Sequence, residues 1–309
     1  MNRRVGPELR LIRCILQVKI NSLVAASNIS KFLQQKVCPI DFRWITLWLG
    51  IPSRVRLPWG VVWRAENDAC GRAILRGQFE NAERQFVERY LEPGMTVLDI
   101  GAHHGFYSML ASKKVDGGGR VIAFEPSPRE REKLARHLAW NSCGNVRVEE
   151  TALGETEGRA DFFVVASKET GCNSLRQPQT KHPTRTLQVQ VKRLDDYLRT
   201  SQVERVDFIK LDVEGAELSV LKGAGEILEC RPRPILLCEV QDLRTKAWGY
   251  SALEIIKFLA SRGYGWFMLL EDGSLRMVDT NGRKEWDGNF AAVPPERSED
   301  LRNRGLLAT

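Results

Sequence analysis

The chain has 309 residues, 43% of them hydrophobic, which is enough for one large domain or two small ones with a packed core. The formal net charge is +7, but residues 1–40 carry seven basic side chains and one acidic one, so +6 of it belongs to this arm. A nucleic-acid-binding function inferred from overall charge therefore loses most of its support. No segment approaches the 18 consecutive apolar residues of a membrane-spanning helix, so we expect no transmembrane segment.

Seven cysteines are present, an odd number without a Cys-x-x-Cys pair. This pattern favours reduced thiols in a cytoplasmic protein over a disulfide framework or a zinc site.

The first 80 residues are predicted to form a basic helical extension followed by an aromatic-rich cap. Residues 9–24 have apolar side chains at helical spacing and polar ones on another face. We favour a helix that packs on the catalytic domain or makes a homodimer contact over one that adheres weakly to an anionic membrane surface. Four tryptophans then suggest a cap over a ligand cleft, although they could equally belong to a core: Trp44, Trp48, Trp59 and Trp63.

A strand–turn–helix–strand unit follows a helix over about 81–91. Strands are predicted at Thr96–Ile100 and Arg120–Phe124, with a glycine turn at 101–105 and a helix over about 106–114 between them. Gly101 lets the chain turn sharply off the first strand, and Gly105 opens the helix, whose free N–H groups can bind an anionic group. This βαβ unit predicts a nucleoside site at the carboxyl edge of a parallel sheet.

The residues of the turn distinguish between cofactors. Glu125, followed by Pro126, ends the second strand 24 residues after Gly101, a spacing that suits a carboxylate bound to the two hydroxyls of a ribose. The turn is Gly-Ala-His-His-Gly, and His103 replaces the glycine that would admit a pyrophosphate, which argues against nicotinamide or flavin. S-adenosylmethionine, which has a ribose and no pyrophosphate, fits better.

The remaining elements continue the parallel sheet. Helices are predicted over about 128–141, 217–229 and 252–262, and strands over about 146–153, 206–213 and 234–240. At the end of the 146–153 strand, Glu150 or Thr151 could contact adenine, or both could simply be polar strand-end residues. Residues 155–186 form a long insertion, and the closing strands suggest an antiparallel edge on the sheet.

The motifs DIGAHHGFYS, AFEPSP, TALG, IKLDVEGAE and LLCEV resemble the FkbM family of S-adenosylmethionine-dependent methyltransferases over roughly residues 85–295. The resemblance implies a class I, Rossmann-like α/β fold with a seven-stranded, mostly parallel sheet. It also implies methyl transfer, usually to a hydroxyl of a natural product or sugar. By motif position, Asp99, Gly101, Ala102 and Gly105 would form the loop at the methionine end, Glu125 would hold the ribose, and Lys210, Asp212 and Glu214 would line the reaction site.

The chain departs from the family pattern in two places. His103-His104 stand where the family often has Asn-Ile, and Gln241 stands where it often has histidine. The second departure leaves the catalytic base open.

Asp212 is the first candidate base, with Glu214 and Glu239 at neighbouring strand ends. Lys210 alternates with Asp212 on one strand face, so the two are predicted to pair. Adjacent residues rarely converge on one ion, so we predict no metal at His103-His104.

We therefore predict a cytoplasmic, metal-independent O-methyltransferase that acts on a small molecule or glycan. Its predicted parts are the extension and cap over residues 1–80, the methyltransferase domain over 81–295 and a polar tail over 296–309. The alternatives are an RNA methyltransferase, disfavoured by the local placement of charge, and a non-catalytic cofactor-binding scaffold acting through the N-terminal helix.

Overall fold

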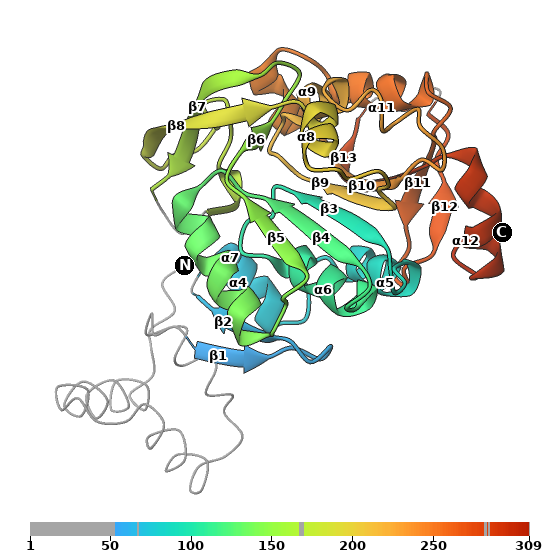
Figure 1. The fold of residues 1–309 in the computed structure, drawn as a ribbon. Coiled ribbons are helices and arrows are strands. Elements are labelled where there is room, and N and C mark those ends of the chain that lie inside the picture. The colour runs from blue at the N-terminus through green and yellow to red at the C-terminus, as the bar shows by residue number, and fades with distance from the viewer. Residues whose placement is uncertain (1–52, 67, 167–169, 281–282, 284, 309) are drawn as a thin grey trace, which may run out of the picture. The chain divides into compact units, whose positions relative to one another are not determined.

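A computed structural model describes residues 53–66, 68–166, 170–280, 283 and 285–308 (Figure 1). Its main element is an eight-stranded sheet in which five adjacent strands are parallel. The strands in spatial order are β12 (Leu275–Met277), β11 (Gly265–Leu269), β13 (Asp287–Val293), β10 (Ile235–Gln241), β9 (Phe208–Leu211), β3 (Thr96–Ile100), β4 (Arg120–Phe124) and β5 (Val146–Glu149). β13 runs antiparallel to both its neighbours, and the edge strand β12 runs antiparallel to β11. The predicted α/β class with an antiparallel edge is confirmed, with the short β12 as an eighth strand.

Helices cover both faces of this sheet (Figure 1). On one face lie α5 (Asn81–Tyr90), α6 (Phe106–Val115) and α7 (Pro128–Trp140), and on the other lie α8 (Leu194–Thr200), α9 (Glu217–Lys222) and α11 (Ala252–Ala260). Because side chains alternate along a strand, Leu98 and Ile100 of β3 join the core under α8, α9 and α11. Asp99, between them, faces α6 on the other side. The remaining helices are α4 (Ala69–Leu75), α10 (Asp242–Thr245), α12 (Ser298–Asn303) and the 3₁₀ turns η1 (Thr170–Cys172), η2 (Lys246–Trp248) and η3 (Pro295–Arg297).

Residues 53–80 are part of the same compact unit as the sheet. β1 (Ser53–Arg56) and β2 (Val62–Ala65) form a hairpin, and the side-chain amide of Asn141, at the end of α7, bonds both the N–H and the C=O of Val62, at 2.7 and 2.8 Å. The indole of Trp63 is fully buried and stacks on His137 of α7, with 4.2 Å between ring centroids. The C-terminal residues also pack on this unit, because Leu301 and Leu306 are buried. The compact unit is therefore wider than the predicted domain over 81–295.

The insertion after β5 forms a second, three-stranded sheet. Its order is β6 (Ala152–Leu153), β8 (Thr184–Lys192) and β7 (Gly158–Val165). The single strand predicted over 146–153 is thus wrong, because the chain leaves the first sheet after Glu149 and joins the second at Ala152. A turn of 3₁₀ helix, η1, follows β7 and leads back toward the main sheet.

The predicted helix over 9–24 and the tryptophans at 44 and 48 lie outside the described residues. Within the described part, no helix is both long enough and apolar enough to cross a membrane.

Candidate active site

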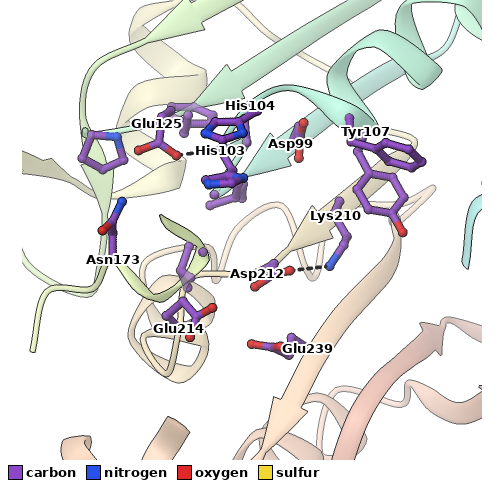
Figure 2. A pocket seen from close by; sticks show the side chains of 18 of the residues that line it. Asp99, His103, His104, Tyr107, Glu125, Asn173, Lys210, Asp212, Glu214 and Glu239 are labelled. Carbon is purple, nitrogen blue, oxygen red and sulfur yellow. Dashed lines mark hydrogen bonds and ion pairs between the residues drawn. The ribbon is translucent and has the colours of Figure 1, made fainter. Parts of the chain in front are cut away.

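A cavity of about 250 Å³ opens at the carboxyl ends of the central strands (Figure 2). Almost all of the predicted site residues lie in its wall: Asp99, Gly101, Ala102, His103, Glu125, Pro126, Thr151, Lys210, Asp212, Glu214 and Glu239. Gly105 and Glu150 do not. Residues that are far apart in the sequence thus meet at one edge of the sheet, as the carboxyl ends of parallel strands must.

The glycine turn is held against two strands at once. The N–H groups of Gly101 and Ala102 both donate to the carbonyl of Phe124, at 3.0 Å, which turns the chain off β3 beside β4. Gly101 has φ +87°, and a Cβ there would lie 1.8 Å from the carbonyl oxygen of Asp212. Only glycine fits between these two backbones. Gly105, also at positive φ, stands behind the wall, where a Cβ would lie 2.2 Å from the side chain of Leu134.

Glu125 is fixed by backbone donors on either side. Its carboxylate accepts from the N–H of His103 and from that of Ser127, both at 2.8 Å. His103 has φ +50°, an uncommon conformation for a residue with a side chain, and this conformation directs its N–H at the carboxylate. Burial raises the pKa of Glu125 to about 7. The side chain remains in the cavity wall, oriented and available to a diol.

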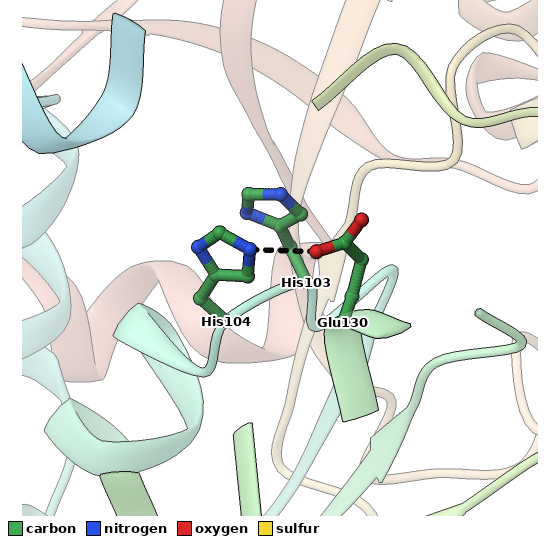
Figure 3. Close-up of side chains that lie close together, drawn as sticks. All are labelled: His103, His104 and Glu130. Atoms are coloured by element: carbon green, nitrogen blue, oxygen red, sulfur yellow. Dashed lines mark hydrogen bonds and ion pairs between the residues drawn. The ribbon is translucent and has the colours of Figure 1, made fainter. Parts of the chain in front are cut away.

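The two histidines of the turn stack on each other, with ring centroids 3.6 Å apart (Figure 3). Burial lowers the pKa of His103 to about 3 and that of His104 well below its usual range, which favours the neutral form of both rings. His104 Nε2 lies 2.7 Å from the fully buried carboxylate of Glu130, to which the neutral ring donates. His103, His104 and Glu130 come close enough for a metal ion, but nearly parallel stacked rings do not aim their lone pairs at one point.

Behind the turn, a chain of hydrogen bonds joins it to β2. His137 accepts at Nε2 from the N–H of Arg64, at 3.0 Å, and its Nδ1 donates to the carbonyl of His104, at 2.7 Å. Only a neutral ring can do both, and burial lowers the pKa of His137 to about 4. The β1–β2 hairpin thus helps to position the glycine turn.

The predicted pair on β9 is present. Lys210 Nζ lies 3.0 Å from Asp212 Oδ2, and the lysine side chain is fully buried (Figure 2). The register of β3 and β9 sets Asp99 opposite Lys210. The carboxylate of Asp99 accepts from the hydroxyl of Ser108 on α6, and burial raises its pKa to about 6. Lys210 and Asp99 therefore stand on the same face of the sheet, below the Gly101 turn.

Two further carboxyls lie beside Asp212. Ligand atoms of Asp212, Glu214 and Glu239 lie within 4.8 Å of one another. Glu214 pairs with Arg244, at 2.8 Å from Nε, and burial raises its pKa to about 8. Burial together with the neighbouring carboxylates raises the pKa of Glu239 well above its usual range. The structure thus brings all four predicted reaction-site residues together.

Glu150 and Thr151, the two candidates for the adenine contact, have side chains in different positions. The Glu150 side chain is 78% exposed and pairs with Arg131, at 3.2 Å, outside the cavity wall. The prediction of Glu150 in the site is wrong, because the chain turns there from the first sheet to the second. Thr151 is buried in the wall, and its Oγ1 has no hydrogen-bond partner among the described residues.

Sequence reasoning missed several residues of the wall. Glu80 faces Lys210 and accepts from the hydroxyl of Tyr107, at 2.5 Å. Asn173, from the insertion, donates to Glu130, at 3.3 Å, and the neighbouring Ser174 donates through Oγ to the carbonyl of Glu214, at 2.9 Å. The other missed wall residues include Phe79, Phe106, Phe162 and Leu175. Trp63 lies in the wall and is also fully buried, so it fits both the predicted cap and the alternative use in a core, and Trp59 is not in the wall.

A family model described as "Methyltransferase FkbM domain" matches residues 99–265, which is more than half of the chain. The chain belongs to this family. The resemblance of the five motifs is thereby confirmed, and with it S-adenosylmethionine as the cofactor that the family implies.

Similar proteins carry related names. The 2-O-methyltransferase NoeI of Sinorhizobium fredii is 28% identical over 162 residues, covering 47% of this chain and 63% of that protein. The hexuronic acid methyltransferase AglP of Haloferax volcanii is 24% identical over 168 residues, covering 54% of this chain and 62% of that protein. Methyltransferase 1 of Beauveria bassiana is 26% identical over 150 residues, covering 42% and 58%. The matches thus span about three fifths of each relative's length.

Among solved structures, the O-methyltransferase TomG of Streptomyces achromogenes matches with a TM-score of 0.40 and 15% identity, over 70% of this chain and 79% of that one. The precorrin-6y C5,15-methyltransferase of Geobacter metallireducens matches with a TM-score of 0.40 and 14% identity, over 69% and 87%. Likeness of this degree says nothing about function.

The wall fits S-adenosylmethionine in three respects. Glu125 offers an oriented carboxylate for the ribose, and Thr151, in the same wall, offers a buried hydroxyl without a partner among the described residues. Carboxyl groups outnumber ammonium groups in the wall, which suits a ligand that carries both an ammonium and a sulfonium charge. The residues present therefore fit the cofactor.

Proposed function

We propose that this FkbM-family domain methylates a hydroxyl oxygen of a small molecule or glycan, with S-adenosylmethionine as the methyl donor. The observation that carries the proposal is the position of Asp212, whose carboxylate ends β9 in the cavity wall and is held there by buried Lys210. The name of NoeI, a 2-O-methyltransferase, supports transfer to a hydroxyl.

In this proposal, the residues of the chain position the cofactor and the acceptor, and one of them accepts a proton. Glu125 and Thr151 would hold the nucleoside, and the Gly101 turn with Asp99 would hold the amino-acid end. The cofactor, when bound, supplies an electrophilic methyl group. Fixing the two reactants in line can contribute about 7–11 kcal/mol to lowering the barrier. Asp212 would accept the proton of the acceptor hydroxyl, and Lys210 would keep the carboxylate oriented.

Asp212→Asn tests this assignment. We expect kcat to fall by a factor of about 10²–10⁴, because the amide cannot accept the proton. The affinity for S-adenosylhomocysteine, measured by calorimetry, should change by less than about threefold, because other residues hold the nucleoside. Transfer is followed with methyl-tritiated donor and an extract that contains the acceptor. Glu150→Gln, exposed and outside the wall, is the control. Unchanged turnover in Asp212→Asn would remove Asp212 as the base.

An RNA acceptor is the second candidate, favoured by one observation. A 53-residue stretch is 45% identical to the ribosomal RNA large subunit methyltransferase E of Nitrobacter winogradskyi. The stretch covers only 16% of the chain, and the acidic cavity wall disfavours a polyanion. An RNA acceptor would show label in RNA and binding that weakens steeply with salt.

The scaffold alternative predicts another result. Cofactor binding without labelled product in any extract, together with partner capture that is lost on deleting residues 1–40, would favour it. The localisation and the homodimer remain predictions.

A further inference from the structure

The cavity wall is strongly acidic. Among the described residues that line it, six carry carboxyl groups and one carries an ammonium group. The carboxyl groups are those of Glu80, Asp99, Glu125, Asp212, Glu214 and Glu239, and the ammonium group is that of Lys210. Burial lowers the pKa of both wall histidines, which disfavours a compensating positive charge on either ring.

The one wall cation is already engaged by the protein. Lys210 Nζ contacts Asp212 at 3.0 Å and the side-chain carbonyl of Asn289 at 3.2 Å, and it lies 5.3 Å from the centre of the Tyr107 ring. These contacts surround a group that has three N–H donors. Arg244, which pairs with Glu214, is outside the wall. An anionic acceptor would therefore find no uncommitted cation in the described part of the wall.

Glu239 is the least compensated of these carboxyls. Its Oε2 is buried and has no hydrogen-bond partner among the described residues. It extends from β10 toward the side of the cavity where Asp212 and Glu214 lie (Figure 2). A hydroxyl or an ammonium group can donate a hydrogen bond to a buried acceptor atom that has no partner. Another anion would offer that atom no donor and would bring further negative charge beside it.

We propose that the acceptor presents its hydroxyl within an uncharged or cationic unit, such as a neutral or amino sugar, and that Glu239 is a specificity-determining residue that rejects anionic units. This inference rests on the proposed function and names the acceptor class of the same site. The proposed acceptor of this chain thus differs in charge from a hexuronic acid, which the name of AglP gives for that protein. The methylated product would be an ether, not an ester.

The first experiment identifies the labelled unit. The 309-residue chain is incubated with methyl-tritiated S-adenosylmethionine and extract, and the product is treated with mild alkali and then hydrolysed to its monomer units. We expect the label to survive alkali and to reside on a unit that an anion exchanger does not retain at pH 7. Release of labelled methanol by alkali, or label on an anionic unit, would overturn the inference but leave methyl transfer standing. Cofactor binding without any labelled product would instead refute the proposed function.

The second experiment uses Glu239→Gln, which keeps the side-chain volume and removes the ionisable carboxyl group. The extract is split into anion-exchange-bound and unbound pools. We expect the ratio of label incorporated from the bound pool to that from the unbound pool to rise at least threefold. Glu226→Gln, whose exposed carboxylate pairs with Arg199, is the matched control and should leave the ratio unchanged. An unchanged ratio in Glu239→Gln would remove Glu239 as the selective residue.

Thermal unfolding gives a readout that does not depend on turnover. Glu239→Gln should raise Tm at pH 8 relative to the unmodified chain, because the variant no longer holds a poorly compensated carboxyl. A lower Tm would mean that the protein already satisfies the carboxylate and would count against the proposal.

A bound divalent cation is the rival explanation of the three-carboxyl cluster. If dialysis against EDTA abolished transfer and Mg²⁺ restored it, the cluster would hold a cation and the inference would fail.

Discussion

Glu125 shows how a buried charge is prepared for a ligand. Two backbone N–H groups orient its carboxylate, yet burial still raises its pKa to about 7. The protein thus positions the group without fully stabilising its charge. Donors from a ribose would complete the set.

We predict that Glu125→Gln weakens binding of S-adenosylhomocysteine by about 10- to 100-fold. A hydrogen bond to a charged group contributes about 1.5–3 kcal/mol, and the amide also turns an NH₂ toward one of the two backbone donors. Calorimetry at pH 8 would measure the change. Glu150→Gln, from the exposed neighbour of Thr151, should bind as the unmodified chain does. A loss of less than threefold in Glu125→Gln would remove the ribose assignment.

At this scale, sequence reasoning found the residues that local pattern fixes. The spacing from Gly101 to Glu125 and the alternation of Lys210 with Asp212 follow from strand and turn geometry. Glu80 and Asn173 were not predicted as cavity residues, because neither ends a strand of the main sheet. Glu80 reaches the cavity only because α5 packs beside the sheet, and Asn173 only because the insertion folds back over it. Ordinary residue types before a helix or inside a long loop carry no signal for such contacts.

Among the elements, the glycine turn and the end of β9 are bound to each other by contact of their backbones. A Cβ at position 101 would lie 1.8 Å from the Asp212 carbonyl oxygen, and no side-chain rotation could relieve that contact. At position 105 the obstacle is the end of the Leu134 side chain, which can shift. At Gly117 nothing lies within 4 Å and φ is not positive.

These contacts predict an order of stability for three variants. Gly101→Ala should lower the free energy of unfolding the most, by more than about 3 kcal/mol, because its Cβ would clash with backbone atoms, in addition to the strained φ that both Gly101 and Gly105 have. Gly105→Ala should cost less, about 1–3 kcal/mol, and Gly117→Ala should cost less than about 0.5 kcal/mol. Urea titration followed by circular dichroism would measure all three. Equal losses at 101 and 117 would contradict the close approach of the turn and β9.

The elements themselves were predictable where the pattern was strong. The βαβ unit at 96–124 and the helix after Ser127 form as expected, although the Ser127 hydroxyl makes no cap bond and Pro128 begins the helix unaided. The split of the 146–153 strand was not predictable, because Val146–Glu149 alternates as a strand does, Ala152–Leu153 is apolar, and no glycine or proline interrupts the run. Only the partner strand β8, some 40 residues later, distinguishes them, and partner choice is a tertiary property.

In the molecule as a whole, buried carboxyl groups and buried histidines change the stability of the fold with pH in opposite directions. Burial raises the pKa of Glu125 and Glu217 to about 7 and that of Glu214 to about 8. An acid with a raised folded-state pKa contributes stability at low pH that is lost as pH rises through that value. The buried histidines have lowered pKa values, so their effect has the opposite sign and is complete only about one pH unit above the unfolded-state value of about 6.5.

We therefore predict that Tm of the cofactor-free protein falls as pH rises from 7.5 to 8.5. Over this range the histidines are mostly neutral in both the folded and unfolded states, because an unfolded histidine titrates at about pH 6.5, and the raised pKa of Glu214, about 8, governs the trend. Scanning calorimetry at constant ionic strength would follow the trend. S-adenosylmethionine should raise Tm more at pH 8.5 than at pH 6.5, because its positive charges favour ionised carboxyls. A Tm that rose with pH over this range would contradict the assigned shifts.

The loop between β7 and β8 is attached to the rest of the unit by contacts that have a practical consequence. Ser174 donates to Glu214, Asn173 donates to Glu130, and Arg176 lies 5.1 Å from the centre of the Trp248 ring, whereas residues 177–183 follow these contacts in the chain and lie outside the cavity wall. We expect that outer stretch to tolerate substitution. Libraries confined to it would diversify the rim that an incoming molecule meets first, while the cofactor turn and the reacting carboxylates keep their frame.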